Sequence, residues 1–236
     1  MSNTLNIARR EFAAYFNSPI AYIFIVVFLL FSGYMFFTEL FVSGQADMRP
    51  FFGLAPLIFC FFGPLVTMRL FSEEKRDGTL EMLLAFPVTD WEVVIGKFLA
   101  AFGLVTVALA LTLPYAFFVA SYGPLDKGPA IGGYLGLLMM AGGYLAIGLM
   151  ASVWTKNQIV AAIIGFMICF SLFLMGKLLQ VVPQSIAPVF QALSLDYHFQ
   201  SIARGVIDTR DVLYYLTLMG ISLVVAETSL ESRRWR

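Results

Sequence analysis

The sequence predicts an all-α integral membrane protein, and three observations support this class. Hydrophobic residues make up 60% of the 236-residue chain and charged residues 13%, about half the charged share of a typical soluble domain. The mean hydropathy of +0.84 means more apolar surface than a soluble fold of this length can bury. The apolar residues form long runs, which as helices can each cross about 30 Å of hydrocarbon. The net charge of zero gives no indication of a nucleic-acid partner.

The N-terminal segment, residues 1–17, is amphipathic. Apolar residues such as Leu5 and Phe12 recur at helical spacing, and Arg9 and Arg10 take the other face. This pattern predicts a short helix lying in the membrane interface, with a solvated terminus as the alternative. A cleavable signal peptide is not expected, because the apolar run that follows is too long and lacks a cleavage site.

Six membrane spans are predicted within one transmembrane domain, 1–236. Ser18 and Pro19 start the first span, with serine as the cap and proline at the first helical position. Pro56, Pro64 and Pro114 lie inside later spans, where neighbouring helices can satisfy the freed carbonyls and where kinks are expected. The predicted spans are 19–42, 51–71, 93–122, 130–153, 159–182 and 212–230.

Two polar or glycine-rich features shape the second half of the chain. Gly132 and Gly136 form a GxxxG pair, which permits close helix packing. The contact can be within the chain or at a dimer seam. Residues 183–211 are too short and mixed for two further spans, so they are predicted to form short re-entrant or interfacial helices on the outer side.

The distribution of lysine and arginine predicts the orientation. With the N-terminus inside, ten of the 15 basic residues face the cytosol and five face outward. Six spans then place both termini and residues 72–92 in the cytosol, and residues 183–211 outside. The outward set is Arg49, Lys127, Lys177, Arg204 and Arg210.

The cytosolic stretch between the second and third spans carries its own helix signals. Gly78 marks a turn, Thr79 can cap a helix, and Pro87 ends it about two turns later. Thr89 and Glu92 then have capping-box spacing and start the third span. The product is a short cytosolic helix with a leucine face, although a simple return loop is the alternative.

The same stretch, TMRLFSEEKRDGTLEMLLAFPVTDWEVVIGKF at 67–98, resembles the signature of permease subunits of type-2 ABC exporters. It is most similar to the branch named for gliding-motility ABC permeases, and more distantly to nitrous-oxide-reductase maturation permeases. Three other stretches agree: IARREFAAYFNSPIAYI at 7–23, FFGLAPLIFCFFGPLVTMR at 51–69 and AIGLMASVWTKNQIVAAI at 146–163. The resemblance is dense over the first two-thirds of the chain.

The resemblance implies a six-span permease in the bacterial cytoplasmic membrane that works with a second permease copy or a related permease. A cytosolic ABC ATPase dimer would drive it, with an accessory envelope protein as a possible further partner. Gly78–Pro87 would be the coupling helix that sits in a groove of the ATPase, and Thr155–Gln158 a smaller contact. The implied coupling residues are Glu73, Glu74, Gly78, Thr79, Leu80, Glu81, Leu83, Leu84, Pro87 and Lys156.

No catalytic, metal or cofactor site is expected in the chain itself. The sequence contains no G-x-x-x-x-G-K-[ST] motif, so any ATP would be bound and hydrolysed by a partner. Cys60 and Cys169 lie in apolar runs and His198 stands alone, which favours packing roles. An ATP-independent secondary transporter or channel is one alternative, and a structural anchor of a motility or envelope machine is another. The sequence does not indicate the substrate.

Overall fold

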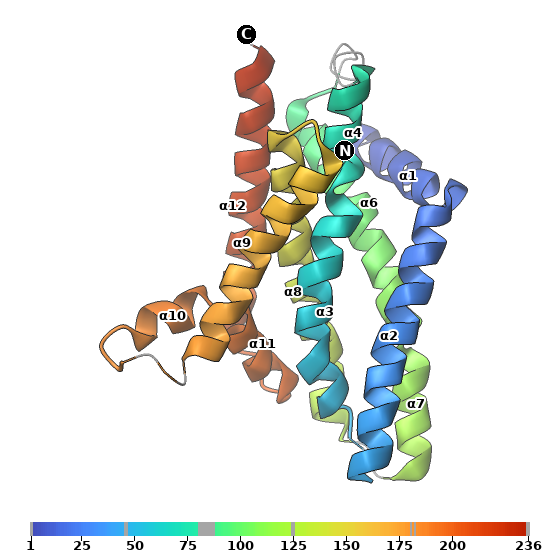
Figure 1. The fold of residues 1–236 in the computed structure, drawn as a ribbon, viewed down its shortest axis with the longest axis vertical. Helices are drawn as coiled ribbons and strands as arrows, with labels where there is room; N and C mark the ends of the chain where they lie inside the picture. The colour runs from blue at the N-terminus through green and yellow to red at the C-terminus, as the bar shows by residue number, and fades with distance from the viewer. Residues whose placement is uncertain are drawn as a thin grey trace.

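The computed structural model describes residues 2–44, 47–79, 88–123, 126–179, 181 and 183–234, and every regular element in these ranges is an α-helix. Six stretches are long and apolar enough to cross a membrane, which confirms the predicted fold class (Figure 1). The helices are α1 (Ser2–Asn17), α2 (Pro19–Ser43), α3 (Arg49–Thr67), α4 (Arg69–Asp77), α6 (Asp90–Ala110), α7 (Leu113–Tyr122), α8 (Lys127–Trp154), α9 (Gln158–Leu178), α10 (Ala187–Leu193), α11 (Leu195–Ala203) and α12 (Thr209–Arg234).

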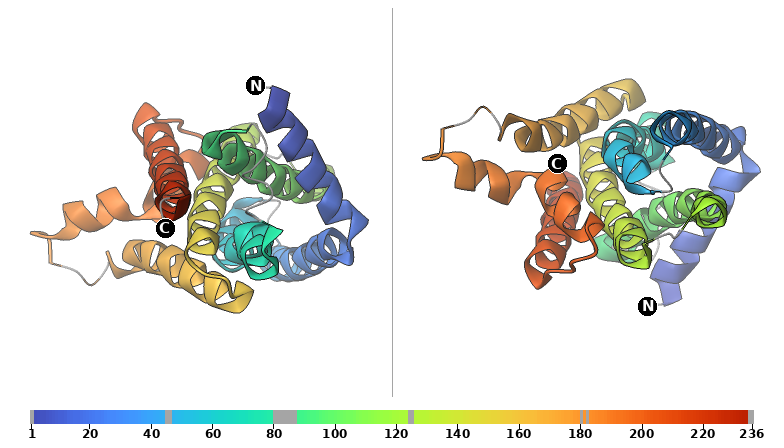
Figure 2. Two further views of the ribbon diagram at one scale, coloured as in Figure 1. Left: turned by 90° about the horizontal axis from the view of Figure 1, so that it is seen from above. Right: turned by 90° about the horizontal axis from the view of Figure 1, so that it is seen from below.

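Helix α8 is the centre of the bundle. Of its most apolar 18-residue stretch 83% is buried, against 22% in α9 and 17% in α12. Figure 2 shows α3, α9 and α12 arranged around it. The outer helices therefore present apolar side chains outward, as expected for helices that face lipid.

Glycines let the neighbouring helices approach α8 closely. A Cβ on Gly148 would collide with Thr67 Oγ1 and come within 2.9 Å of Pro64 Cα on α3. The predicted GxxxG pair faces α11, where a Cβ on Gly136 would lie 3.1 Å from the ring of Phe199. This glycine pair therefore packs within the chain, which was one of the two predicted alternatives, the other being a dimer seam.

Two of the spans are broken helices. The third predicted span consists of α6 and α7, and the break at Leu111–Thr112 comes just before Pro114, where a kink was predicted. The second consists of α3 and α4, which are separated at Met68. Pro56 and Pro64 stay inside α3, so proline is not at the second break itself.

The helix starts bear out some of the predicted caps and correct another. Thr89 and Glu92 form the predicted capping box, with Glu92 N–H donating to Thr89 Oγ1 at 3.3 Å and Thr89 N–H donating to Glu92 Oε2 at 3.0 Å. Ser18 occupies the N-cap position of α2 but makes no side-chain cap hydrogen bond; its hydroxyl donates to the Tyr15 carbonyl at 3.0 Å. The Ser18 side chain thus bonds the last turn of α1 rather than the first turn of α2.

Helix α1 confirms that the N-terminal segment is helical. It lies across the bundle at the end that carries both termini (Figures 1 and 2). Ile7 and Tyr15 are each 7% exposed, and a Cβ on Gly96 of α6 would overlap the Ile7 side chain. The apolar face of α1 is therefore covered by α6 and its neighbours.

Residues 187–203 form the two short helices α10 and α11, as predicted for the outer segment. They lie alongside the lower half of the bundle rather than beyond its end (Figure 1). Ser194 caps α11 by accepting the Tyr197 N–H at 3.1 Å. Tyr214 and Tyr215 of α12 donate to the carbonyls of Leu193 and Leu195, both at 2.7 Å, which fixes the segment to the last span.

Candidate functional site

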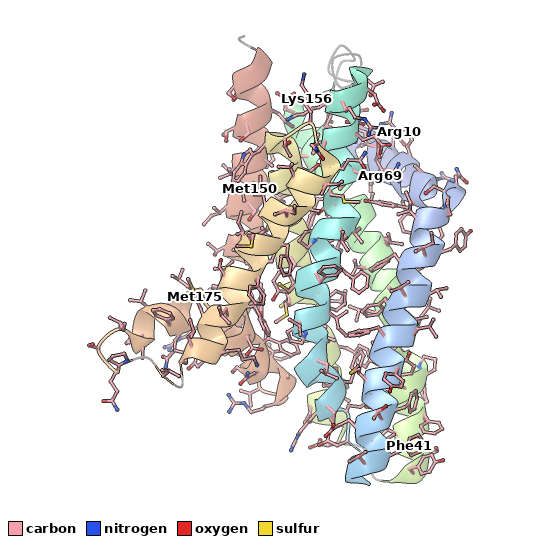
Figure 3. All side chains as sticks on the ribbon, viewed as in Figure 1. Arg10, Phe41, Arg69, Met150, Lys156 and Met175 are labelled. Atoms are coloured by element: carbon pink, nitrogen blue, oxygen red, sulfur yellow. The ribbon has the colours of Figure 1, made fainter. Side chains whose placement is uncertain are left out.

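The structure describes five of the ten predicted coupling residues: Glu73, Glu74, Gly78, Thr79 and Lys156. Glu73 and Glu74 lie in α4, which Gly78 ends in the left-handed conformation at φ 72°, and Thr79 follows. Lys156 is exposed in the connection between α8 and α9. Figure 3 shows Lys156 and Arg69 at the same end of the bundle as Arg10, with Phe41 at the opposite end. The remaining predicted residues lie outside the described ranges: Leu80, Glu81, Leu83, Leu84 and Pro87.

Helix α4 is joined to α8 through the hydroxyl of Ser152. The N–H groups of Phe71 and Ser72 donate to Ser152 Oγ at 3.0 and 3.1 Å. In a continuous helix these donors would bond to carbonyls four residues earlier. The hydroxyl in turn donates to the Met68 carbonyl at 3.0 Å. An inserted side chain of this kind is a recognised cause of a helix break, and it explains why α3 and α4 part at Met68.

A second bond ties α4 to the end of α8. Lys75 is buried, and its ammonium group donates to the Val153 carbonyl. This carbonyl belongs to the last turn of α8, where cations are favoured because the helix leaves its final carbonyls unpaired. Lys156 follows Val153 by three residues, so the connection that carries it directly follows the turn of α8 to which α4 is bonded.

Lys97 joins α4 to α6 and α1. Its side chain is 1% exposed, and Nζ lies 2.7 Å from Glu74 Oε1 and 3.5 Å from Glu11 Oε1. The same Nζ lies 5.2 Å from the ring centroid of Phe71, within the range of a cation–π contact. Glu74 Oε2 is buried and has no hydrogen-bond partner among the described residues. The ammonium group therefore links three helices with little access to solvent.

Two further charged residues of α4, Arg69 and Glu73, pair with each other within the helix. Arg69 Nε and Nη2 donate to the two carboxylate oxygens of Glu73 at 2.8 and 2.9 Å. This bidentate geometry is the strong form of such a pair. Glu73, predicted to contact an ATPase, is thus already paired at the wall of a 210 Å³ pocket between α1 and α4.

Tyr15 anchors α1 to α3 beside that pocket. Its hydroxyl donates to the Val66 carbonyl at 2.8 Å, and Asn3 Nδ2 donates to Glu92 Oε2 at 3.5 Å at the other end of α1. Burial, and then the nearby Glu11 carboxylate, raise the pKa of Tyr15. The phenol therefore stays a neutral donor at any physiological pH, and α1 is held at both ends.

Sequence reasoning missed the residues that hold α4 in place. Lys97 contributed only its charge to the predicted orientation, although a lysine four residues after the start of a predicted apolar span is a signal for a buried partner. Ser152 gave no such signal, because a hydroxyl in an apolar run looks the same whether it bonds its own helix or another.

The other candidate residues have packing or pairing roles. Cys60 and Cys169 are buried free thiols. His198 Nδ1 lies 2.6 Å from Asp211 Oδ1, and its ring stacks on Tyr214 with the centroids 4.0 Å apart. Across the described ranges there is no group of three or more His, Cys, Asp or Glu residues that could hold a metal ion.

Comparison with known proteins identifies the family. The family profile described as ABC-2 family transporter protein matches residues 5–219, which include all six apolar helices in whole or in part. A search of curated proteins found no match. The chain belongs to the ABC-2 transporter family and is a multi-pass membrane component of that family.

Proposed function

We propose that this ABC-2 family membrane protein is the coupling subunit of an ATP-driven exporter in the bacterial cytoplasmic membrane. In this proposal a separate cytosolic ABC ATPase dimer binds and hydrolyses ATP, and two permease copies, or this chain and a related permease, form the membrane part. The end of the bundle that carries both termini faces the cytosol. The observation that supports it best is the bonding of α4 to α8, α6 and α1 through Ser152, Lys75 and Lys97.

The proposed mechanism follows from that bonding. An ATPase that grips residues 78–87 would displace the end of α4 next to Gly78. Because Ser152 bonds two N–H groups of α4 and Lys97 bonds Glu74, the displacement would pass to α8 and α6 rather than be lost at the break at Met68. Helix α8 contacts most of the other spans, so its movement would reach the whole bundle.

The resemblance to gliding-motility ABC permeases supports export or envelope work as the output, and we keep that branch as part of the proposal. The stretches at 7–23, 51–69, 67–98 and 146–163 carry it. A structural anchor with little substrate movement would bind the ATPase at the same end of the bundle, the end that carries both termini and α4, which we call the coupling end. Substrate-stimulated ATP hydrolysis by the complex separates a transporter from an anchor.

The docking part is tested by co-purification with an ABC ATPase from a neighbouring reading frame. Replacing residues 80–87 by a glycine–serine linker of equal length leaves Gly78 and the capping box in place. We expect this variant to insert in the membrane and to lose the ATPase. Lys156→Ala should weaken the association in part, and Lys127→Ala, an exposed lysine at the opposite end, is its matched control. Normal recovery of the ATPase with the linker variant would rule out docking at this segment.

The transmission part needs a reporter at the far end of the bundle. Phe41 is 69% exposed and lies at the opposite end (Figure 3), while both native cysteines are buried. A spin label on Phe41→Cys should report a change in distance between two permease copies when ATP is added. Ser152→Ala should reduce that change while the ATPase stays bound. An unchanged response in Ser152→Ala would show that motion does not pass through this hydroxyl.

An ATP-independent transporter is a weaker candidate. The buried ion pair lies in the first half of α6, eight residues after the capping threonine at its cytosolic start, rather than near the midplane where coupling ions bind in secondary transporters. Transport by the purified protein alone, driven by an ion gradient, would favour this alternative.

A further inference from the structure

A second pocket lies far from the coupling end. Its volume is 260 Å³, and it is formed by the start of α3, the last turn of α9 and the length of α11. Three basic side chains line it, Arg49, Lys177 and Arg204, with the rings of Phe52 and Phe199. Pockets for drug-sized ligands measure about 300–1,000 Å³. This one is smaller, which suits a headgroup-sized ligand.

The floor of the pocket is built around one buried carboxylate. The Asp196 side chain is 4% exposed, and its Oδ2 lies 2.9 Å from Lys177 Nζ and accepts the Gln200 amide at 2.8 Å. A Cβ on Gly176 would come within 3.0 Å of Asp196 Cβ, so α9 and α11 are packed tightly here. The acid is therefore neutralised within the wall, and it holds Lys177 and Gln200 in place.

The two arginines keep donors available to a ligand. Arg204 is exposed and uses its Nε to donate to the Gln200 carbonyl at 3.1 Å, which leaves the two terminal nitrogens of the fork without an acidic partner among the described residues. Among the described residues, Arg49 pairs with the half-buried Asp47 at 3.4 Å, and 68% of the Arg49 side chain stays accessible. Three cations against two paired carboxylates, Asp196 and Asp47, leave an excess of positive charge at the pocket.

Its place in the fold puts the pocket at the edge of the membrane. Arg49 is the first residue of α3 and Lys177 lies in the last turn of α9, so each stands where an apolar helix meets its polar end. Helices α10 and α11 lie beside the bundle at this depth (Figure 1), and Met175 marks the approach of α9 to α10 in Figure 3. Leu174, one turn before Lys177 on α9, is 38% exposed, so apolar surface adjoins the charged one.

We propose that this pocket binds a phosphate group, in its strongest form the headgroup of an anionic phospholipid in the leaflet at this end of the bundle. Arginine forks match phosphate oxygens in a bidentate geometry. The exposed apolar surface of α9 beside Lys177 suits the acyl chains of such a molecule. The inference does not depend on ATP coupling, since no residue of the pocket belongs to the coupling end.

The test measures binding to the purified full-length chain in a neutral detergent by isothermal titration calorimetry. The probes are dihexanoyl phosphatidylglycerol, dihexanoyl phosphatidylcholine and inorganic phosphate. We expect the anionic lipid to bind more tightly than the zwitterionic one. Arg204→Gln and Arg49→Gln should each weaken its binding about tenfold, the loss of one charge-assisted hydrogen bond. Arg210→Gln removes an exposed cation at the same end but outside the pocket, and should leave binding unchanged.

Each outcome supports or overturns the proposal. Inorganic phosphate binding as tightly as the lipid, and lost in the same variants, would support the phosphate chemistry and assign the ligand to solution. Equal binding of the two lipids, or equal losses in Arg210→Gln and Arg204→Gln, would overturn it. Arg204→Lys keeps the charge and should retain part of the affinity. All the variants change exposed side chains, and unchanged thermal unfolding would show that a loss of binding is not a loss of folding.

Discussion

Each end of the bundle contains a lysine–carboxylate ion pair, and the two pairs differ in how far each partner is exposed to solvent. Lys97 and Lys177 each bind a carboxylate at short range, 2.7 Å to Glu74 and 2.9 Å to Asp196. The Lys97 side chain is 1% exposed, however, whereas that of Lys177 is 48% exposed. In the Lys97–Glu74 pair the cation is the enclosed partner, whereas in the Lys177–Asp196 pair the carboxylate is enclosed. An enclosed cation can only hold helices together, while an accessible one can also meet a ligand.

Backbone bonding extends the contrast. Helix α4 reaches α8 through a hydroxyl that bonds two N–H groups and through an ammonium group that bonds a terminal carbonyl. Helices α10 and α11 are held to α12 by the hydroxyls of Tyr214 and Tyr215, and the chain between α11 and α12 is exposed. The first arrangement suits the transfer of motion, whereas α11 is held mainly by close packing against α8 and α9.

The largest effect is expected from removing the enclosed cation. Lys97→Met leaves Glu74 buried without its donor and should lower the free energy of unfolding by about 2 kcal/mol. This lies below the ~3–5 kcal/mol of a fully buried pair, because both carboxylates keep some contact with solvent. Thermal unfolding in detergent measures it. Glu74→Gln in the same chain should recover part of the loss, and a double variant no more stable than the single one would contradict an ionic role.

Next in size is the close contact between α3 and α8. Gly148→Ala places a methyl group against Thr67 Oγ1 and the Pro64 backbone, and overpacking of this kind costs about 1–3 kcal/mol. Gly220→Ala is the matched control, because no atom lies within 4 Å of the Cβ position there and alanine favours a helix. The thermal midpoints of the two variants should move in opposite directions. Equal shifts would mean that α8 tolerates a wider separation from α3.

The smallest effect is expected at the exposed cation. Lys177→Met should cost less than about 1 kcal/mol, because the pair is open to solvent and Gln200 still donates to Asp196. The same variant should nevertheless weaken the binding of anionic lipid. If its thermal midpoint fell as far as that of Lys97→Met, the distinction between an enclosed and an accessible cation would fail.

Local signals in the sequence predicted local structure well. The capping box of Thr89 and Glu92 formed because both partners lie within four residues of each other, and Pro114 lies just past a break for a similarly local reason. Ser18 shows the limit of such signals: it occupies the predicted position, yet its hydroxyl bonds the end of α1 instead. A cap has two neighbours, and the residue type does not show which one it serves.

The candidate site depends on contacts between distant parts of the chain. Ser152 bonds Phe71 and Ser72, which lie 81 and 80 positions earlier in the sequence, and Lys97 bonds Glu74, which lies 23 positions earlier. No periodic pattern indicates which helices become neighbours, so these contacts could not be read from the sequence. The extent of α4 was also missed: the second span was expected to end at residue 71, and the helix instead continues as α4 to Asp77. Polar residues end the apolar run but do not end a helix.

The segment between α4 and α6 has a defined bond pattern at each of its ends. Gly78 adopts a left-handed conformation with its N–H bonded to the Glu74 carbonyl, and the Thr89 capping box, which Asn3 of α1 also reaches through Glu92, starts α6. The ten residues in between can therefore be exchanged as a cassette between family members without changing either junction. If an ATPase docks at this segment as proposed, a chimera of this design would take the donor's ATPase preference and keep the recipient's membrane bundle.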